Sequence, residues 1–559
     1  MNIQSTKGST PRVQALVSLL IEKGLTNRKS EWFKQEELPN IASIKNAESI
    51  SLIERRAMAL RAMLESMTNE SLSNRTHSYE IKDGELIVGN IPMGSLGFGK
   101  IFPNYLTDKE KEVAYFSSRD VESVLGHNAP NYSKLLKMGL KGILEVCDIN
   151  LKELNQKDEL SDREKRKKEF YNAVKISSEA VVEYAKKFAK LAENKAKKAK
   201  GKDLDELLEI IRICKKVPYH PAESFHEALQ SIYFLHLTFH ASTSHVSFGR
   251  LDQVLEPYLQ MSLQNKEFNL SKAQELTECF LIKCSERLTL TMKYAIEQDF
   301  TDFATGMGHS PFLVDQEATI NQFMQNIVIG GQTKDGKDAT NDCTYVFLEA
   351  CSSAGLPTPI INLRLHKNSP EKLIQKAAEA SYKGNNGQPI IYNDEVIIPA
   401  LLKNPKIPKT DAFDYIVDGC WEVLLNGKCD FTYNMVNMLT VMECALNQGA
   451  LLTEGNMELR GRKMSYLSKE PSEIKNFDEF REIFLKHLNL FVKKAGMEVY
   501  SFYCLEGSVT PVPLFSALLG NCLEKGIDKT WGGADLNIGG VVYIAMPNTA
   551  NAFASIKKW

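Results

Sequence analysis

The sequence predicts an α/β protein in which a helical N-terminal layer precedes a mainly parallel sheet, either open or closed into a barrel. In the first two hundred residues, apolar side chains recur at three-and-four spacing, as in SLIERRAMALRAMLESM (51–67), which is typical of amphipathic helices. From about residue 220, short apolar runs such as NIVIGG (326–331) and PIINLRL (359–365) alternate with helical stretches such as SPEKLIQKAAEASYKG (369–384). Alternating strands and helices indicate βα units around a parallel sheet.

The composition is that of an ordinary globular protein. Of the 559 residues, 43% are hydrophobic and 25% are charged, and the formal net charge of -2 offers no strong field to nucleic acid or to an anionic membrane. The N-terminus lacks the apolar core of a signal peptide, and no window approaches eighteen uninterrupted apolar residues. We therefore expect a cytoplasmic protein whose partners include neither nucleic acid nor a membrane.

A single domain over residues 1–559 is expected, with a mostly helical layer over 1–215 and an α/β part over 216–559. No linker rich in Gly, Ser or Pro separates the two parts, and no repeat of 20 to 50 residues is present. The lysine-rich run 186–202 is interpreted as a solvated helix face rather than a nucleic-acid patch, because acidic residues flank it and no aromatics interleave.

The eleven cysteines are expected to be free thiols. Their number is odd, no CxxC pair occurs, and a chain of this size needs no disulfide staples. Neither a disulfide framework nor a bound metal is therefore predicted, and most of the thiols should be buried.

The segment GGQTKDGKD (330–338) comes within one residue of a phosphate-binding loop. Gly331, Gly336 and Lys337 fit the spacing of that loop, but Asp338 stands where a Ser or Thr would bind magnesium. A Gly-rich turn between a strand and a helix is the preferred interpretation. A nucleotide-binding α/β enzyme remains a minor alternative.

The segment ASTSHVSFGRLDQVLEPYL (241–259) gathers three chemically active side chains. Arg250 and Asp252 are most simply an ion pair at the start of a helix. His245, taken alone, is more typical of a hydrogen-bonded core histidine than of a catalyst.

The segment DGCWEVLLNGKCDF (418–431) sets Cys420 two positions before Glu422, directly after a run that reads as a strand. Gly419 allows a tight backbone just before the cysteine, and loops after strand ends often carry the chemistry of α/β proteins. A neighbouring carboxylate raises the pKa of a thiol, which does not suit a nucleophile that must be a thiolate. A neutral thiol beside a carboxylate suits hydrogen-atom transfer by sulfur and proton transfer by the carboxylate.

Together with other segments in the same order, this segment resembles the glycyl radical enzymes, the pyruvate formate-lyase-like family. The resemblance covers the chain from about residue 50, and the order and number of its motifs make it specific. The motifs are DGELIVGN (83–90), GHNAPNYSKLLKMGLKGI (126–143), PAESFHEALQ (221–230), SFGRLDQVLEPYL (247–259), MQNIVIGGQTKDGKDATN (324–341), GQPIIYNDEVIIPAL (387–401), DYIVDGCWE (414–422), ECALNQGA (443–450), WGGADLN (531–537) and ANAFASIKK (550–558).

The resemblance implies a ten-stranded barrel of two five-stranded halves, surrounded by helices, with Cys420 on a loop tip inside it. It implies that a glycyl radical converts Cys420 to a thiyl radical, which takes a hydrogen atom from a small organic substrate. In the eliminating branch of the family, Glu422 would act as general base or acid. The acyl-transferring branch carries two adjacent cysteines, whereas Trp421 follows Cys420 here, so a lyase or dehydratase is expected rather than a formate C-acetyltransferase.

The resemblance also implies a set of substrate-binding residues. His127, His245 and Phe323 fall in segments that line the substrate pocket of the family. Asn131 replaces the aspartate that diol-type members tend to have in the GHxxxDY segment, and Asn434 lies in FTYNMVN, where a carboxylate is expected. Without these two carboxylates, the pocket lacks the groups that would bind substrate hydroxyls or a quaternary amine. The sequence therefore does not determine the substrate class or the bond that is cleaved.

The partners implied by the resemblance are a separate S-adenosylmethionine and iron–sulfur activating enzyme and, when the protein is complete, a second copy of it. Family members run on further and carry the radical glycine in an RVxGY-like segment, which does not occur in this sequence. The barrel is therefore expected to be incomplete at the C-terminus, and the chain alone to be inactive and poorly soluble. A catalytically silent fragment or subunit is the alternative.

Overall fold

The computed structural model describes ten stretches of the chain, and they divide into two compact units. The first unit comprises Met1–Asp430 and Glu506–Leu536, and the second comprises Phe431–Leu505 and Asn537–Trp559. We describe each unit by itself. The described stretches are residues 7–26, 35–90, 102–116, 127–240, 242, 246–286, 325–384, 386–419, 422–451 and 461–558.

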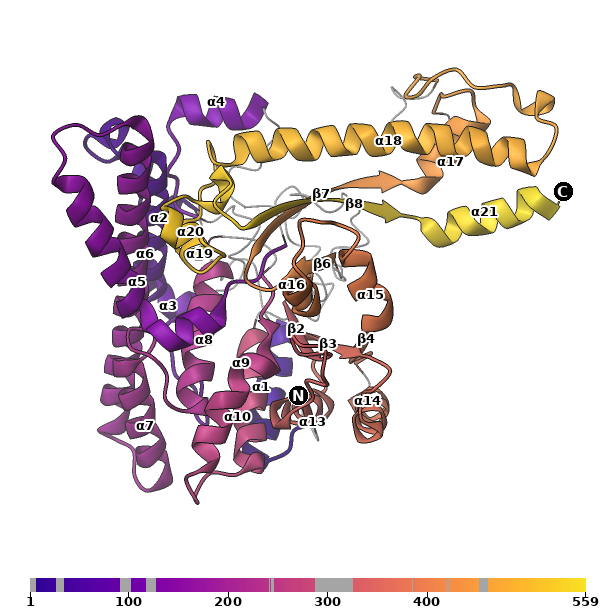
Figure 1. Ribbon diagram of the computed structural model, residues 1–559. Helices are drawn as coiled ribbons and strands as arrows, with labels where there is room; N and C mark the ends of the chain where they lie inside the picture. Colours follow the sequence, from indigo (N-terminus) through magenta and orange to yellow (C-terminus); the bar gives the residue numbers. More distant parts are fainter. Residues whose placement is uncertain are drawn as a thin grey trace. The chain divides into compact units, whose positions relative to one another are not determined.

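The first unit begins with a layer of amphipathic helices (Figure 1). Its long helix α6 packs against α2, α5 and α7, and Ser161 starts α6 with a capping box that involves Glu164. The inward face of α6 buries Phe170, Val181 and Phe188. The helices are α1 (Pro11–Thr26), α2 (Leu52–Met67), α3 (Glu70–Thr76), α4 (Asp108–Phe116), α5 (Tyr132–Asn155), α6 (Asp162–Ala196), α7 (Lys202–Lys216) and α8 (Phe225–His240).

The lysine-rich end of α6 is a solvated helix face, which confirms the prediction for this run. Lys186 pairs with Glu183 at 2.7 Å and Lys190 pairs with Glu193 at 3.2 Å, one helical turn apart in each case. Both lysine side chains are exposed. Their charge is therefore shared with neighbouring carboxylates rather than concentrated in a patch for nucleic acid.

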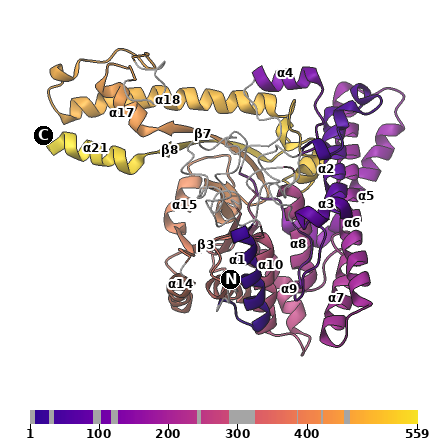
Figure 2. The same ribbon diagram turned by 180° about the vertical axis from the view of Figure 1, so that it is seen from behind.

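A four-stranded parallel sheet with the order β1-β2-β3-β4 forms the other part of the first unit. Successive strands are joined through helices, as the alternation of patterns in the sequence predicts. Helix α1 lies beside α10, as Figure 2 shows from behind, and it also contacts α13. The elements are β1 (Gly249–Arg250), α9 (Leu251–Leu263), α10 (Leu270–Cys284), β2 (Asn326–Gly330), α13 (Asp342–Ala354), β3 (Ile360–Leu365), α14 (Glu371–Gly384), β4 (Ile390–Asn393), α15 (Asp394–Leu401) and α16 (Lys409–Phe413).

A short antiparallel hairpin follows the sheet, formed by β5 (Tyr415–Asp418) and β6 (Glu422–Leu425). Its register pairs Asp418 with Glu422 and Tyr415 with Leu425. Arg364 of β3 ties the sheet to the hairpin, since its buried guanidinium binds both carboxylate oxygens of Asp394 at 2.9 Å and donates to the carbonyl of Tyr415 at 2.9 Å. These contacts hold the hairpin against the polar face of the sheet.

The predicted ion pair between Arg250 and Asp252 is not the contact that the structure forms. Arg250 pairs instead with Asp414 at 3.1 Å and donates to the carbonyl of Gly330. Asp252 accepts hydrogen bonds from the Gly330 amide at 2.7 Å and from the Thr344 hydroxyl at 2.7 Å. The two side chains bind different neighbours because the fold brings a different distant segment next to each of them.

The Gly-rich loop after β2 folds back on itself. The amide of Thr333 donates to the carbonyl of Lys337 at 2.8 Å, and the amide of Gly336 donates to the carbonyl of Thr333 at 2.9 Å. The exposed ammonium of Lys337 pairs with Asp335 at 2.8 Å. This arrangement agrees with the preferred interpretation of the segment as a turn between a strand and a helix.

The second unit has a small core of its own. Phe480 and Phe484 of α18 pack against Phe553 of α21, with ring centroids 5.9 and 4.8 Å apart. The strands β7 and β8, which begin in the first unit, form a two-stranded sheet. The helices and strands of this unit are β7 (Cys429–Asn437), α17 (Met438–Leu446), α18 (Phe477–Glu506), β8 (Leu536–Ile544) and α21 (Met546–Lys558). The short helices α19 (Pro513–Ala517) and α20 (Cys522–Lys525) belong to the first unit.

Two general features of the described residues bear on the predictions. Their strands form sheets of four, two and two strands, with helices around them, which is an α/β arrangement. Within the same residues, every helix is too short or too polar to cross a membrane.

Candidate functional site

The buried pair His127 and Glu422 forms the centre of the candidate site. Glu422 is the first residue of β6, and its Oε2 lies 3.5 Å from Nδ1 of His127. The side chain of His127 is fully buried, and that of Glu422 is 9% exposed. A carboxylate and an imidazole at this distance, largely screened from bulk water, form an ion pair when the imidazole carries a proton. Cys420, the predicted partner of Glu422, lies outside the described residues, as does Trp421.

Gly419 brings the backbone before Cys420 directly against His127. Its φ is +57°, and a Cβ built on it would lie 2.1 Å from Nε2 of His127. Any side chain at this position would displace the imidazole. The next residue after the histidine strengthens the contact, since the amide of Asn128 donates to Oδ2 of Asp418 at 3.0 Å. The segments around residues 127 and 419 are thus held together on both sides.

Asp418, the last residue of β5, is buried and immediately precedes Gly419. Burial raises its pKa well above the ordinary value, and the negative charge of Glu422 raises it further, although hydrogen bonds from its neighbours oppose the shift. The side-chain amide of Asn326 reaches both Oδ1 of Asp418, at 3.4 Å, and the carbonyl of Gly419, at 3.2 Å. This amide fixes the end of β5, so the start of the turn toward Cys420 is positioned by the sheet.

One face of the parallel sheet supplies polar side chains toward the hairpin. Registered residues of parallel strands share a face, and Arg364 is in register with Tyr392. Asn362, two residues before Arg364 on β3, donates to Oδ1 of Asn326 at 3.0 Å. Tyr392 was not among the residues selected from the sequence. The signal for it was the alternation in PIIYND, where Ile391 points outward and is 58% exposed.

The other predicted substrate-binding residues are placed differently. Asn131 caps helix α5, where its side-chain oxygen accepts from the amide of Lys134 at 2.9 Å. Asn434 lies on β7 in the second unit, and its amide donates to the carboxylate of Glu498. His245 and Phe323 lie outside the described residues. Of the predicted set, the structure therefore brings His127 and Glu422 together.

The described carboxyl groups nearest to Cys420 in the sequence are those of Asp418 and Glu422. The ten described cysteines are all free, and nine of them are buried. Among the residues that the structure describes, no group of three or more His, Cys, Asp or Glu side chains is arranged to hold a metal ion.

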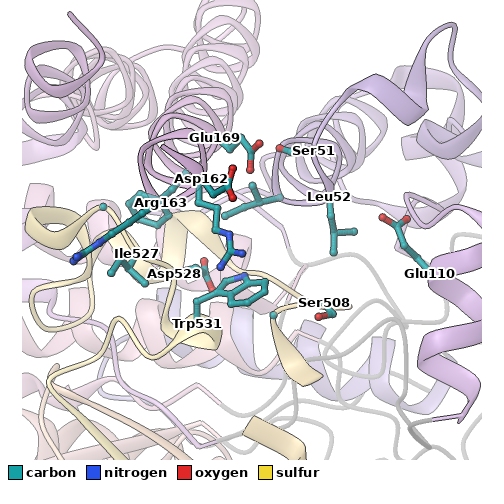
Figure 3. Close-up of a pocket in the computed structure, with 15 residues that line it drawn as sticks. Ser51, Leu52, Glu110, Asp162, Arg163, Glu169, Ser508, Ile527, Asp528 and Trp531 are labelled. Carbon is teal, nitrogen blue, oxygen red and sulfur yellow. The ribbon is translucent and has the colours of Figure 1, made fainter. Parts of the chain in front are cut away.

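A cavity of about 670 Å³ lies in the helical part of the first unit (Figure 3). Asp162 and Glu169 reach it from α6, and Trp531 lies on its other side, with the guanidinium of Arg166 5.0 Å from the centre of the indole. The described site residues do not line this cavity. It is therefore distinct from the site around Glu422.

Comparison with known proteins agrees with this arrangement. The family "Pyruvate formate lyase-like" matches residues 111–559. The isethionate sulfite-lyase of Nitratidesulfovibrio vulgaris is 28% identical over 436 residues, which cover 77% of this chain and 49% of that protein. The trans-4-hydroxy-L-proline dehydratase of Clostridioides difficile is 28% identical over 441 residues, which cover 76% of this chain and 51% of that protein. The chain thus spans about half the length of the curated relatives it matches.

Solved structures give the same result for the fold. The glycerol-bound B12-independent glycerol dehydratase of Clostridium butyricum superposes with a TM-score of 0.77 at 26% identity, over 100% of this chain and 72% of that one. The predicted α/β fold class, that of the pyruvate formate-lyase-type barrel with surrounding helices, is confirmed by this match.

Proposed function

Because the chain belongs to the pyruvate formate lyase-like family, we propose that it contributes the substrate-binding and proton-transferring site of a glycyl radical lyase or dehydratase. The observation that carries the proposal is the buried contact of 3.5 Å between His127 and Glu422, beside the backbone that leads to Cys420. Glu422, one member of this pair, stands two residues after Cys420 in the sequence, which supports its assignment to proton transfer. Eliminations that start from a carbon radical need one group for a hydrogen atom and another for a proton.

The residues of this chain divide the reaction between them. When supplied, the glycyl radical of the family would provide the hydrogen-atom chemistry that makes the Cys420 thiol a radical. The sulfur then takes a hydrogen atom from a substrate C–H bond. Glu422 gives a proton to the leaving group as the bond from carbon to that group breaks, and it regains a proton from the substrate. Finally Cys420 returns the hydrogen atom to carbon, so that the net change is loss of the protonated leaving group.

His127 positions Glu422 for both donation and acceptance of a proton. Nδ1 of His127 faces the Glu422 carboxylate, and Gly419 packs against Nε2 of the same ring. Burial is the chief cause that raises the pKa of Asp418, so this carboxyl group releases its proton less readily than an ordinary aspartate. Glu422 is therefore the carboxylate that we assign to proton transfer.

We propose a small hydroxylated molecule as the substrate. The relatives are named for isethionate and trans-4-hydroxy-L-proline, and glycerol is bound in the related dehydratase structure. Each of these molecules carries a hydroxyl group near the carbon that would lose hydrogen. The family resemblance further supports a separate activating enzyme that installs the radical and a homodimer as the working state.

The proposal is tested on the radical-loaded holoenzyme under anaerobic conditions, with isethionate, trans-4-hydroxy-L-proline and glycerol as substrates. Cys420→Ser should abolish product formation, because an O–H bond is too strong to yield its hydrogen atom to the glycyl radical. Cys504→Ser, at an exposed thiol, serves as the matched control and should leave the rate unchanged. Substantial turnover by Cys420→Ser would contradict the proposal.

A further inference from the structure

Tyr392 lies on the sheet face that points toward the hairpin. It is in register with Arg364, and the side chain of Arg364 donates to the carbonyl of Tyr415 in the hairpin. Asn326, on the same face, donates to the carbonyl of Gly419. Ile391, the preceding residue of β4, is exposed on the opposite face. The phenol of Tyr392 is therefore directed to the side on which Glu422 begins β6.

The hydroxyl group of Tyr392 is buried and makes no hydrogen bond to any residue that the structure describes. Buried tyrosine hydroxyls usually have a hydrogen-bond partner. The Tyr415 hydroxyl donates to Asp394 at 2.8 Å, and the Tyr233 hydroxyl donates to the carbonyl of Lys283 at 3.2 Å. Burial of an unpaired hydroxyl costs free energy, so this hydroxyl favours a hydrogen-bond acceptor other than the described residues, which supply none.

Burial and the nearby charge of Glu422 together set the pKa of the Tyr392 hydroxyl. Burial raises the pKa of Tyr392 well above its ordinary value, and the negative charge of Glu422 raises it further. The phenol therefore keeps its proton throughout the neutral range. It can donate a hydrogen bond, but it cannot act as a base.

We propose that Tyr392 contacts the substrate, and that its hydroxyl donates a hydrogen bond to a substrate oxygen beside the Glu422 carboxylate. This inference rests on the proposed function of the same site. It makes Tyr392 a specificity residue: a substrate with an oxygen acceptor at this point satisfies the buried donor, whereas an analogue that lacks the oxygen leaves it unsatisfied. Sites built around such a donor discriminate strongly against the analogue.

The first arm of the test needs no substrate. In the ligand-free chain, Tyr392→Phe should melt at the wild-type temperature or above it, because the hydroxyl bonds to none of the described residues. Tyr415→Phe is the matched variant and should melt at a lower temperature, because it loses the bond to Asp394. If Tyr392→Phe were destabilised as much as Tyr415→Phe, its hydroxyl would have a structural partner and the inference would be overturned.

The second arm measures recognition. Titration calorimetry compares trans-4-hydroxy-L-proline with L-proline, and isethionate with ethanesulfonate, on the wild-type chain and on Tyr392→Phe. The variant should bind the preferred hydroxylated probe about 10-fold or more weakly and should lose the preference over the deoxy analogue. Tyr258→Phe, at a buried tyrosine of α9, should change neither value.

The outcomes separate this inference from the proposed function. An unchanged preference in Tyr392→Phe would overturn the role of Tyr392 and leave the radical reaction intact. A wild-type chain that prefers neither hydroxylated probe would contradict the proposed substrate class, and the melting temperatures would still decide whether the hydroxyl is structural.

Discussion

The imidazole of His127 lies directly against the α-carbon of Gly419, so that a Cβ at residue 419 would stand 2.1 Å from Nε2. On the other side of the ring, Nδ1 lies 3.5 Å from the carboxylate of Glu422. The two contacts set the orientation of the ring. They also explain why glycine is needed immediately before the predicted catalytic cysteine.

Gly419→Ala should therefore impair both stability and activity. The substitution adds a Cβ where φ is +57° and where the histidine ring already lies, so we expect a loss of more than about 1 kcal/mol in the free energy of unfolding. Gly387→Ala is the matched control, because Gly387 also has a positive φ, +74°, but no atom lies within 4 Å of the added Cβ. Urea unfolding of the two variants checks the difference. Equal losses would show that backbone strain, rather than the histidine contact, sets the cost.

Glu422→Gln should slow turnover more than it weakens binding. The substitution keeps the shape of the side chain but removes the proton transfer, so we expect kcat to fall roughly 10²- to 10⁴-fold while KM changes little. Glu379→Gln, at an exposed glutamate of α14, is the control. Steady-state kinetics of the holoenzyme measure both constants. A rise in KM with an unchanged kcat would assign Glu422 to substrate binding alone.

The stability of the chain should depend on the charge of Asp418. Because its pKa is raised in the folded state, the folded protein holds this proton more tightly, and the contribution of Asp418 is lost as the pH rises above the ordinary aspartate value of about 4. Asp418→Asn removes this titration. Relative to wild type, the variant should become more stable as the pH rises above about 4, since the unfolded wild type then releases the Asp418 proton while the folded wild type still holds it. A difference in melting temperature that is independent of pH would contradict the shift.

The cysteines should react as free thiols of very different accessibility. Denatured protein prepared anaerobically without reductant should titrate with close to its full eleven thiols. In the native chain at about pH 8, alkylation should label the exposed Cys504 first. Burial raises the pKa of Cys351 to about 11 and that of Cys147 to about 12, which slows both. Peptide mapping after short labelling checks the order, and protected pairs of cysteines would disagree with it.

Several features of the protein could be read from local sequence patterns. Apolar periodicity is a property of neighbouring residues, so the helices of the first layer and the alternation around β2 and β3 were predictable. The spacing of Cys420 and Glu422 is also local. Composition and cysteine spacing were sufficient to predict free thiols.

Contacts between distant segments could not be predicted from these patterns. No local pattern indicates that His127 contacts Glu422. Nor does one indicate that Arg250 pairs with Asp414 rather than with Asp252, or that Asn131 caps a helix. Tyr392 became a candidate when the register of β4 on β3 placed it on the face toward the hairpin. The physical reason is that strand order and register are chosen by the burial of whole faces of the sheet, and that choice decides which polar groups share one buried space.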